Sequence, residues 1–363
     1  MKQSKKILIA NRGVIAIRAL RAARELGYSV ASVYSTIDRD QKHLKLSDEA
    51  ICIGPPETKD SYLNEAAIIS AAELSGADAI YPGFGFLAEN ASFAEKCRES
   101  GFKFIGPDPE VIAIMGDKIK AKELAKSLNI PVVPGYEGEI STENEAIKIV
   151  EEIGYPVIIK ASAGGGGRGM RVVNSSDELW QSIQSAQNEA ELAFGDGKIF
   201  IEKYLKKPRH IEVQIFGNGK GEAVHLFTRD CSLQRKYQKI VEEAPALNID
   251  NQKLEKIQNL SVEACKKLNY EGAGTIEFLY ENNDFYFIEM NTRIQVEHTV
   301  TEMITGVDLV QAQLLLALEN KYDFKQEDLK INGHAMQCRI NAEDPLSLIH
   351  ISEPTRLGMI SYA

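Results

Sequence analysis

The sequence predicts an α/β protein that begins with a small, doubly wound parallel sheet and continues into a partly antiparallel region of α+β type. Residues 7–10 and 29–34 are short apolar runs of the buried-strand type, and apolar residues recur at helical spacing between them. Strands and helices alternate in this way up to about residue 115, as they do in doubly wound sheets. From about 200 to 245, and again from 274 to 289, strands follow each other across hairpin turns, which predicts antiparallel pairing.

Composition limits the partners that we expect. The 363 residues are enough for two or three domains. With 42 Lys and Arg against 52 Asp and Glu, the formal charge is −10, which argues against nucleic acid or an anionic membrane as the main partner. The start of the chain has no apolar run of signal-peptide or membrane-span length, and the five cysteines are scattered without CxxC pairs. We therefore expect a cytoplasmic protein without a disulfide framework or a structural zinc site.

Two N-terminal loops carry glycine directly after a predicted strand. Asn11-Arg12-Gly13 follows the first strand but lacks the G-x-G-x-x-G spacing, which disfavours dinucleotide binding there. Pro82-Gly83-Phe84-Gly85-Phe86 follows a later strand. A tight turn and a contact with a ligand explain the glycines of this second loop equally well.

A much denser glycine run lies at 164–169, just after a predicted strand that ends on Lys160. Five of its six residues are glycine, and the sixth is Arg168. Such a run costs backbone entropy, which is justified where N–H groups must approach a ligand or a loop must open and close. It is not a Walker A sequence, because G-K-[ST] is absent. We predict a flap that covers phosphate groups, with a flexible linker as the alternative.

The stretch 288–297 alternates polar and apolar residues almost throughout. If it is extended, one face receives all of its charged and amide side chains, which are Glu289, Asn291, Arg293, Gln295 and Glu297. Carboxylate and amide oxygens suit a hard cation such as Mg²⁺, a guanidinium suits a planar anion, and a further carboxylate could act as a base. The alternative is an exposed amphipathic strand.

A second carboxylate, Glu277, lies between two apolar residues on the preceding predicted strand and so faces away from them. Antiparallel pairing of this strand with the next could set Glu277 beside Glu289. Because two such carboxylates repel each other unless a cation lies between them, they predict a divalent-cation site together with Asn291. The run 235–239 adds three cations, which form either an anion-attracting spot or a solvated strand face.

Together these features resemble the ATP-grasp fold, and motifs dispersed over residues 5–345 resemble biotin carboxylase, the ATP-dependent component of biotin-dependent carboxylases such as acetyl-CoA and pyruvate carboxylase. The motifs are Ile9-Ala-Asn-Arg-Gly13, Tyr81-Pro-Gly-Phe-Gly-Phe86, Met115-Gly-Asp-Lys118, Gly164–Met170, Glu202-Lys-Tyr204, Glu242-Glu-Ala-Pro245 and Phe287–Gly306. The resemblance implies an N-terminal domain over 1–115, an ATP-grasp domain over 116–320 with a lid at about 132–204, and the start of a C-terminal domain at 331–345. Residues 346–363 resemble nothing in the family, so we expect a truncation after Pro345 followed by adapter or vector sequence.

The resemblance also implies roles for single residues, position by position. The nucleotide would be bound by Lys118, Lys160, Gly166, Gly167, Glu202, Lys203, Tyr204, Leu205, His210, Gln234, Tyr237, Glu277 and Glu289. Two Mg²⁺ or Mn²⁺ ions would be held by Glu277, Glu289 and Asn291, and bicarbonate by Lys239, Arg293, Gln295 and the backbone of Val296. Glu297 would be the base and Arg339 would stabilise the biotin enolate, and with Lys239 and Arg293 these are the expected catalytic residues. Tyr237 stands where the family often has His, which puts that one contact in doubt.

The implied activity is the carboxylation of biotin, on a carrier protein or domain, with bicarbonate and ATP through a carboxyphosphate intermediate. This is the first half-reaction of a carboxylase such as acetyl-CoA carboxylase, an enzyme of fatty acid biosynthesis. It implies a biotin carboxyl carrier, a carboxyltransferase and a homodimer as partners. Two alternatives are another ATP-grasp ligase, such as a carbamoyl-phosphate synthase half, and a catalytically silent fragment that binds nucleotide.

Overall fold

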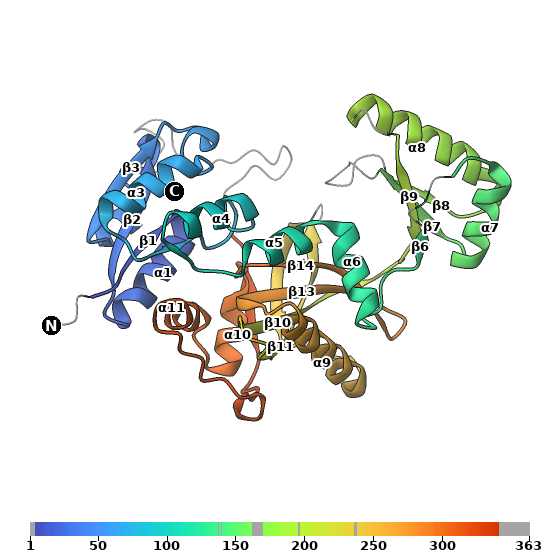
Figure 1. Ribbon diagram of the computed structural model, residues 1–363. Coiled ribbons are helices and arrows are strands. Elements are labelled where there is room, and N and C mark those ends of the chain that lie inside the picture. Colours follow the sequence, from blue (N-terminus) through green and yellow to red (C-terminus); the bar gives the residue numbers. More distant parts are fainter. Residues whose placement is uncertain are drawn as a thin grey trace, which may run out of the picture.

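The computed structural model describes residues 4–136, 138, 140–161, 170–194, 197–235 and 238–340. The glycine run at 164–169, Tyr237 and the stretch 346–363 lie outside these residues, and the predictions made for them stay predictions. The described chain has an N-terminal part, a central sheet, and a smaller part around β7 and β9 that stands at the opposite end of the molecule from the N-terminal part (Figure 1).

The N-terminal part is a parallel sheet in the order β3-β2-β1-β4-β5, which confirms the predicted doubly wound arrangement. Its strands are β1 (Lys6–Ile9), β2 (Ser29–Ser35), β3 (Glu49–Gly54), β4 (Ala79–Tyr81) and β5 (Lys103–Phe104). Its helices are α1 (Gly13–Glu25), α2 (Lys42–Leu46), α3 (Glu65–Ser75), α4 (Ala91–Glu99) and α5 (Pro109–Gly116), with 3-10 turns η1 (Thr36–Asp38) and η2 (Thr58–Asp60). The sequence analysis did not predict α4 and α5.

The central sheet is antiparallel and has the order β14-β13-β10-β11-β12-β15. Its strands are β10 (Arg209–Asn218), β11 (Ala223–Arg235), β12 (Gln238–Ala244), β13 (Glu271–Glu281), β14 (Asp284–Asn291) and β15 (Ala335–Cys338). Its helices are α9 (Asn251–Lys267), α10 (His298–Thr305) and α11 (Leu309–Glu319), followed by the 3-10 turn η4 (Gln326–Asp328). α9 lies against the sheet and buries Ile257, Val262 and Cys265 on its apolar side.

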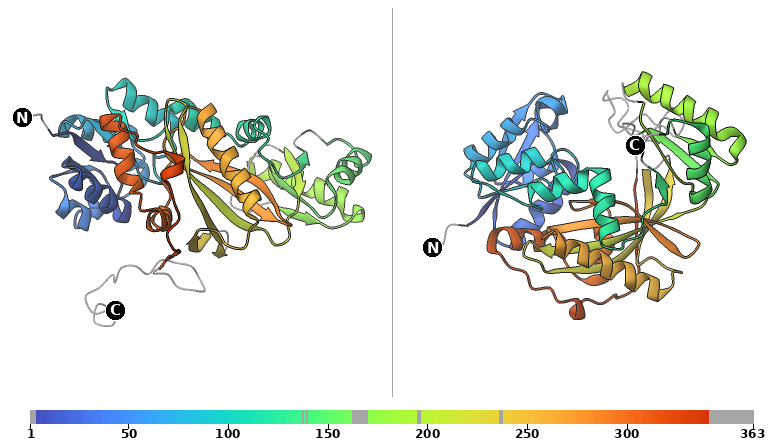
Figure 2. Two further views of the ribbon diagram at one scale, coloured as in Figure 1. Left: turned by 90° about the horizontal axis from the view of Figure 1, so that it is seen from below. Right: turned by 45° about the vertical axis from the view of Figure 1, so that its right-hand side comes forward.

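The smaller part is a four-stranded sheet in the order β6-β9-β7-β8 with its own hydrophobic core. Its elements are β6 (Gly135–Tyr136), α7 (Glu143–Ile153), β7 (Val157–Ala161), β8 (Arg171–Val173), η3 (Ser176–Glu178), α8 (Leu179–Phe194) and β9 (Ile199–Lys203). α6 (Lys118–Ser127) leads into it from the N-terminal part. Two further views show it projecting away from the other two parts, which lie against each other (Figure 2).

Local sequence explains where many helices begin. At six helices an Asn or Asp side chain accepts a backbone N–H of the first turn, which satisfies donors that the helix itself cannot. These residues are Asn64, Asn90, Asp108, Asp117, Asp250 and Asp308. Asp117 caps α6, so the helix begins at Lys118, a predicted nucleotide ligand. The cap therefore fixes the position from which the Lys118 side chain extends.

The prediction of one extended strand over 288–297 is wrong beyond Asn291. β14 ends there, a turn follows, and α10 begins at His298, a helix that the sequence reading missed. The cause is a tertiary contact, because the backbone N–H of Thr292 donates to the carboxylate of Glu89 at 3.1 Å. Glu89 belongs to the loop after β4, so a residue of the N-terminal part turns the chain out of the central sheet.

The N-terminal part and the central sheet share one hydrophobic core. Ile7 from β1 packs in the same cluster as Phe216 from β10. Arg18 on α1 adds ion pairs with Glu302 at 3.0 Å and with Asp308 at 2.6 Å. No single helix of the described residues is long and apolar enough to cross a membrane; α10 and α11 pass that test only as a pair, and they are bent by 92°.

Candidate active site

A row of charged residues crosses the central sheet in direct register. Glu289 on β14 pairs with Glu277 on β13, Glu277 pairs with Glu212 on β10, and Glu212 pairs with Arg229 on β11. The sequence prediction that antiparallel pairing sets Glu277 beside Glu289 is therefore confirmed. Side chains at paired positions point to the same face of a sheet, so the row places three carboxylates and one guanidinium together.

Lys239 on β12 neutralises the middle of this row. Its ammonium group contacts Glu212, and it lies 2.9 Å from Glu277 and 2.8 Å from Glu297. Burial lowers the pKa of Lys239, but the three carboxylates raise it further, so that the net shift is upward. The sequence reading placed Lys239 in either an anion-attracting spot or a solvated face. The structure shows a largely buried ammonium group that is tied to the acidic cluster.

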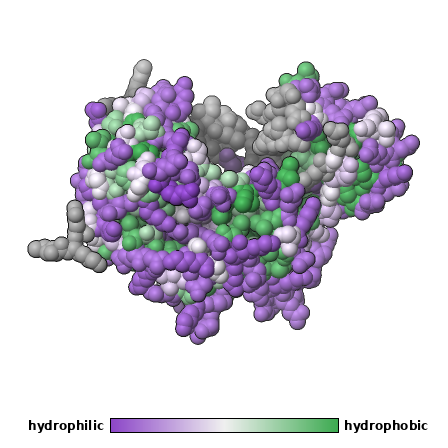
Figure 3. Space-filling model, viewed as in Figure 1, coloured by the Kyte–Doolittle hydropathy of each residue, from purple (hydrophilic) through white to green (hydrophobic). Residues whose placement is uncertain are grey.

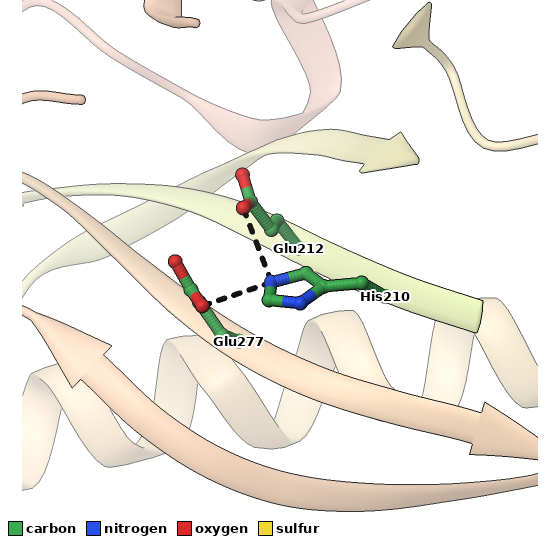
Figure 4. Close-up of side chains that lie close together, drawn as sticks. All are labelled: His210, Glu212 and Glu277. Carbon is green, nitrogen blue, oxygen red and sulfur yellow. Dashed lines mark ion pairs between the residues drawn. The ribbon is translucent and has the colours of Figure 1, made fainter. Parts of the chain in front are cut away.

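His210 joins the same cluster from β10 (Figure 4). One ring nitrogen, Nε2, lies 2.8 Å from Glu277 and 3.4 Å from Glu212, and the other, Nδ1, lies 3.2 Å from the amide nitrogen of Gln234. Burial lowers the pKa of His210, but the two carboxylates raise it to about 9. Burial and the charge of Glu212 act to raise the pKa of Glu277, yet His210 and Lys239 lower it overall. The protein itself thus supplies the cations that keep these carboxylates ionised.

Glu297 ends the turn after β14, where it precedes α10, and it lies between two cations. One carboxylate oxygen accepts from Lys239 at 2.8 Å, and the other accepts from Arg339 at 3.0 Å. Arg339 also donates to Glu242, a fully buried carboxylate on β12, the strand that pairs with β15. Burial raises the pKa of Glu242 in spite of this arginine. The predicted base and the predicted enolate-binding arginine are therefore direct neighbours.

Arg293 and Gln295 reach this region from the turn rather than from a strand. Gln295 donates to Glu277 at 2.6 Å, and its carbonyl oxygen accepts from Arg229. Arg293 lies at the rim, where it donates to Glu89 at 2.8 Å and to the side-chain oxygen of Asn291 at 2.8 Å. Val296 lies in the same turn and is half-buried. The structure thus brings together most of the predicted bicarbonate ligands, although by a turn and not by strand alternation.

The other end of the row, at β14, faces a pocket. Glu289 and Asn291 line it together with Lys118, Met115 and Gly116 from the junction of α5 and α6. Burial and the charge of Glu277 raise the pKa of Glu289, while Lys118 opposes this shift. The carboxylates of Glu277 and Glu289 and the amide oxygen of Asn291 are a suitable donor set for Mg²⁺, and a cation there would replace the hydrogen bond from Arg293 to that amide oxygen. Burial is the larger cause of the raised pKa of Glu289 and the like charge of Glu277 the second, and a divalent cation between the two carboxylates would relieve that repulsion.

The predicted nucleotide residues of the smaller part are organised by a single carboxylate. Glu202 on β9 accepts from Lys160 on β7 at 2.6 Å and from Lys122 on α6 at 2.6 Å. Burial acts to raise the pKa of Glu202, but the two lysines lower it overall. The side chain of Lys203 donates to the carbonyls of Gly154 and Tyr155, and is therefore used inside the protein.

Several of the predicted nucleotide contacts involve backbone groups, and others involve residues that the structure does not describe. The N–H groups of Lys203 and Tyr204 donate to the carbonyls of Pro134 and Pro156, at 2.8 and 2.9 Å. The contacts predicted for Glu202 and Leu205 with the nucleotide stay predictions. Gly166, Gly167 and Tyr237 lie outside the described residues, so their predicted contacts stay predictions.

Among the charged residues that the sequence analysis did not assign to the site, the structure adds Glu89, Lys122, Glu212 and Arg229. Two of them left a signal in the sequence. Lys122 stands four residues after Lys118 and so on the same face of a helix, and Glu212 lies on the polar side of an alternating strand. Glu89 and Arg229 left none, because their partners are distant in sequence.

The arrangement can hold an anion beside a carboxylate base and can hold a nucleotide whose phosphates reach a cation-binding edge. The surface is hollowed between the N-terminal part and the smaller part, above the central sheet that carries these residues (Figure 3).

Residues 117–325 match the family described as carbamoyl-phosphate synthase L chain, ATP binding domain, and residues 3–112 match biotin carboxylase, N-terminal domain. Fold and site define an ATP-grasp ligase.

Curated relatives and solved structures narrow this class. The chain is 55% identical to biotin carboxylase of Haemophilus influenzae, over 98% of this chain and 81% of the relative. It matches the Campylobacter jejuni biotin carboxylase structure with a TM-score of 0.86 at 50% identity, covering 95% of this chain and 78% of that one. A structure of the biotin carboxylase domain dimer of Hydrogenobacter thermophilus 2-oxoglutarate carboxylase, with MgADP, ADP and bicarbonate, gives 0.85 at 48% identity and covers 96% and 77%. The chain belongs to the biotin carboxylase family.

Proposed function

We propose that this chain carboxylates biotin with bicarbonate and ATP, giving ADP and phosphate, as the first half-reaction of a biotin-dependent carboxylase. The observation that carries the proposal is the convergence of Lys239, Gln295 and Glu297 on one spot, beside the paired carboxylates Glu277 and Glu289. An anion-binding group, a base and a cation-binding edge are the three parts that the reaction requires.

In this proposal bicarbonate is held by Lys239, Arg293, Gln295 and the N–H of Val296, and Glu297 removes its proton. The bicarbonate oxygen attacks the γ-phosphorus of ATP and the bond from that phosphorus to ADP breaks, which forms carboxyphosphate. Carboxyphosphate then breaks into CO₂ and phosphate, and phosphate takes the proton from N1 of biotin. The N1 anion attacks CO₂ while Arg339 stabilises the enolate oxygen.

Lys118 and Lys160 hold phosphate oxygens, and the backbone of 202–205 meets the adenine. His210 and Gln234 line the nucleotide pocket, as does the position of Tyr237. Glu277, Glu289 and Asn291 would hold two Mg²⁺ or Mn²⁺ ions, and ions bound there would neutralise charge on the phosphates. Lys160 must exchange Glu202 for a phosphate oxygen, and Lys122 then remains to balance the Glu202 carboxylate. Residues 132–204 act as the lid, and Gly166 and Gly167 lie in its flap.

The domain boundaries are 1–115, 116–320 and 331–345 in this proposal. The partners are a biotin carboxyl carrier and a carboxyltransferase, and the chain pairs with a second copy of itself. Relatives serve different carboxylases, since one is named as part of a pyruvate carboxylase and another belongs to a 2-oxoglutarate carboxylase. The carboxyltransferase chooses the acyl-CoA or keto acid that accepts the carboxyl group in the second half-reaction.

The direct test is bicarbonate-dependent ATP hydrolysis, measured with and without free biotin. We expect biotin to stimulate hydrolysis, and we expect Glu297→Gln to reduce it by about a hundredfold or more because the base is lost, while ADP still binds by calorimetry. Glu281→Gln, at the far end of β13, is the matched control and should keep the wild-type rate. Equal rates for E297Q and wild type would remove Glu297 from the mechanism.

A further inference from the structure

Arg229 on β11 is completely buried at the centre of the polar cluster, with 0% of its surface exposed. Burying a guanidinium is costly unless its charge is paired and its donors are used. All five of its N–H donors have an acceptor within the protein. The acceptors are the side-chain oxygens of Glu212, Gln214, Thr275, Gln295 and Thr301.

Arg229 determines which end of the Gln295 amide faces the pocket. An arginine has donors and no acceptor, so it can meet only the carbonyl oxygen of Gln295. That oxygen accepts from Arg229, and the amide nitrogen is therefore turned the other way, where it donates to Glu277 at 2.6 Å. A flipped amide would set its NH₂ group against the guanidinium and leave buried donors unsatisfied, which costs on the order of 1–3 kcal/mol.

Arg229 orients Glu212 in the same manner. Its Nε donates to one oxygen of Glu212 at 2.9 Å, and the other oxygen is turned toward Lys239 and lies 3.4 Å from His210. Glu212 is also completely buried, so it has no freedom to exchange these partners for water. Arg229 thus fixes the direction of the Gln295 N–H donor. It also fixes the Glu212 carboxylate, the counter-charge of Lys239, beside the place where the proposed function puts bicarbonate.

We propose that Arg229 is a positioning residue for the bicarbonate pocket, acting through Gln295 and Glu212 without contact with the substrate. The inference rests on the proposed function. An anion needs donors that already point at it, because reorienting them during binding would consume binding energy. Without Arg229 the Gln295 amide is free to present its carbonyl oxygen, which repels bicarbonate, and Lys239 loses the support that holds it.

If Arg229 only stabilised the fold, its loss would lower stability without a specific change in bicarbonate binding. Thr301 provides a control for this alternative. Thr301 accepts one Arg229 donor at 2.9 Å and lies on α10, away from Gln295 and Glu212 in the bond network. Thr301→Val keeps the shape of the side chain and leaves one donor of Arg229 without its partner. It should therefore lower the free energy of unfolding by about 1–3 kcal/mol and leave the bicarbonate KM within about twofold of wild type.

Arg229→Lys keeps the charge but offers one ammonium group in place of a planar fork, so it cannot orient both partners. We expect the bicarbonate KM of R229K to rise about tenfold or more, with the ATP KM within about twofold, when bicarbonate-dependent ATP hydrolysis is measured. Urea unfolding of both variants shows whether stability explains the change. Equal bicarbonate KM values for R229K and T301V would overturn the proposal.

Two more variants complete the test. R229K combined with Gln295→Ala should raise the bicarbonate KM by clearly less than the product of the two single effects, because part of the effect of Arg229 passes through Gln295, whereas independent residues would multiply their effects on KM. Glu212→Gln leaves Arg229 in place and should raise the bicarbonate KM about fivefold or more. If R229K does not fold, E212Q decides the matter alone, and an unchanged bicarbonate KM overturns the proposal. Wild-type protein without bicarbonate-dependent hydrolysis would instead contradict the proposed function.

Discussion

The two ends of the charged row on the central sheet are built differently. On β10 and β13 the carboxylates of Glu212 and Glu277 are buried, and Lys239 from β12 and His210 from β10 supply the positive charge. At β14 the surface of Glu289 is partly open to solvent, but the protein atoms packed around its carboxyl group and the charge of Glu277 still raise its pKa. The buried end has its counter-charges within the protein, whereas at the exposed end our proposal places a cation from outside. We expect mutations at the buried end to cost stability, and mutations at the exposed end to cost ligand binding only.

The largest effect on stability should come from Lys239→Met. It leaves Glu212, Glu277 and Glu297 facing one another without their shared cation. Breaking a buried ion pair from one side typically costs about 3–5 kcal/mol, and urea unfolding at pH 7 should show a loss of this size. Lys253→Met removes an exposed lysine that pairs with Asp284 at 3.1 Å and should change stability by less than about 1 kcal/mol. A K239M protein as stable as K253M would show that the buried end is not completed by Lys239.

The same contrast explains how much of the site the sequence could predict. The pairing of Glu277 with Glu289 follows from strand alternation and a short hairpin, which are local properties. The role of Arg229 depends on partners from β10, β13, the turn at 292–297 and α10, which meet only in the folded chain. Strand alternation also led to the wrong backbone for 292–297, because the contact that ends β14 comes from Glu89, about two hundred residues earlier.

The fold shows the same division. The parallel N-terminal sheet and most boundaries of the central elements were predictable, since each rests on a periodic apolar pattern or a cap. α3 (Glu65–Ser75) and β4 (Ala79–Tyr81) have the bounds that the sequence indicated. α10 was missed because its eight residues include buried polar side chains, among them His298 and Thr301, in place of the apolar residues that usually mark the buried face of a helix. The periodic apolar signal therefore fails where the interior is polar.

His210→Gln should have a smaller effect, and one that depends on pH. The pKa of His210 is raised to about 9 from 6.5, so its charged form stabilises the folded protein. This contribution is complete below pH 6.5 and is lost as the pH rises through 9. We expect H210Q to lose on the order of 2 kcal/mol in free energy of unfolding at pH 6, and little at pH 9.5.

A second histidine provides the control for that pH profile. Burial lowers the pKa of His225 to about 4, so its contribution changes only as the pH falls from 6.5 toward 4. The difference in unfolding free energy between His225→Gln and wild type should accordingly be constant from pH 7 to 9. A difference for H210Q that is equally constant over this range would contradict the charged state of His210 at the buried end.

The smallest change in stability should come from Glu289→Gln, and it should have the opposite sign. The raised pKa of Glu289 means that its charge is unfavourable in the folded protein at neutral pH, so E289Q should be as stable as wild type or up to about 1 kcal/mol more stable. The variant should nevertheless lose most of the rise in Tm that MgATP gives the wild-type protein, because stabilisation by a ligand follows its affinity. Asp284→Asn, an exposed change on the same strand, should keep that rise. An E289Q protein that is less stable than wild type without ligand, or that keeps the full MgATP shift, would mean that β14 is not an open cation-binding edge. The expected result would show that the charge of Glu289 destabilises the protein without ligand and is needed for cation binding.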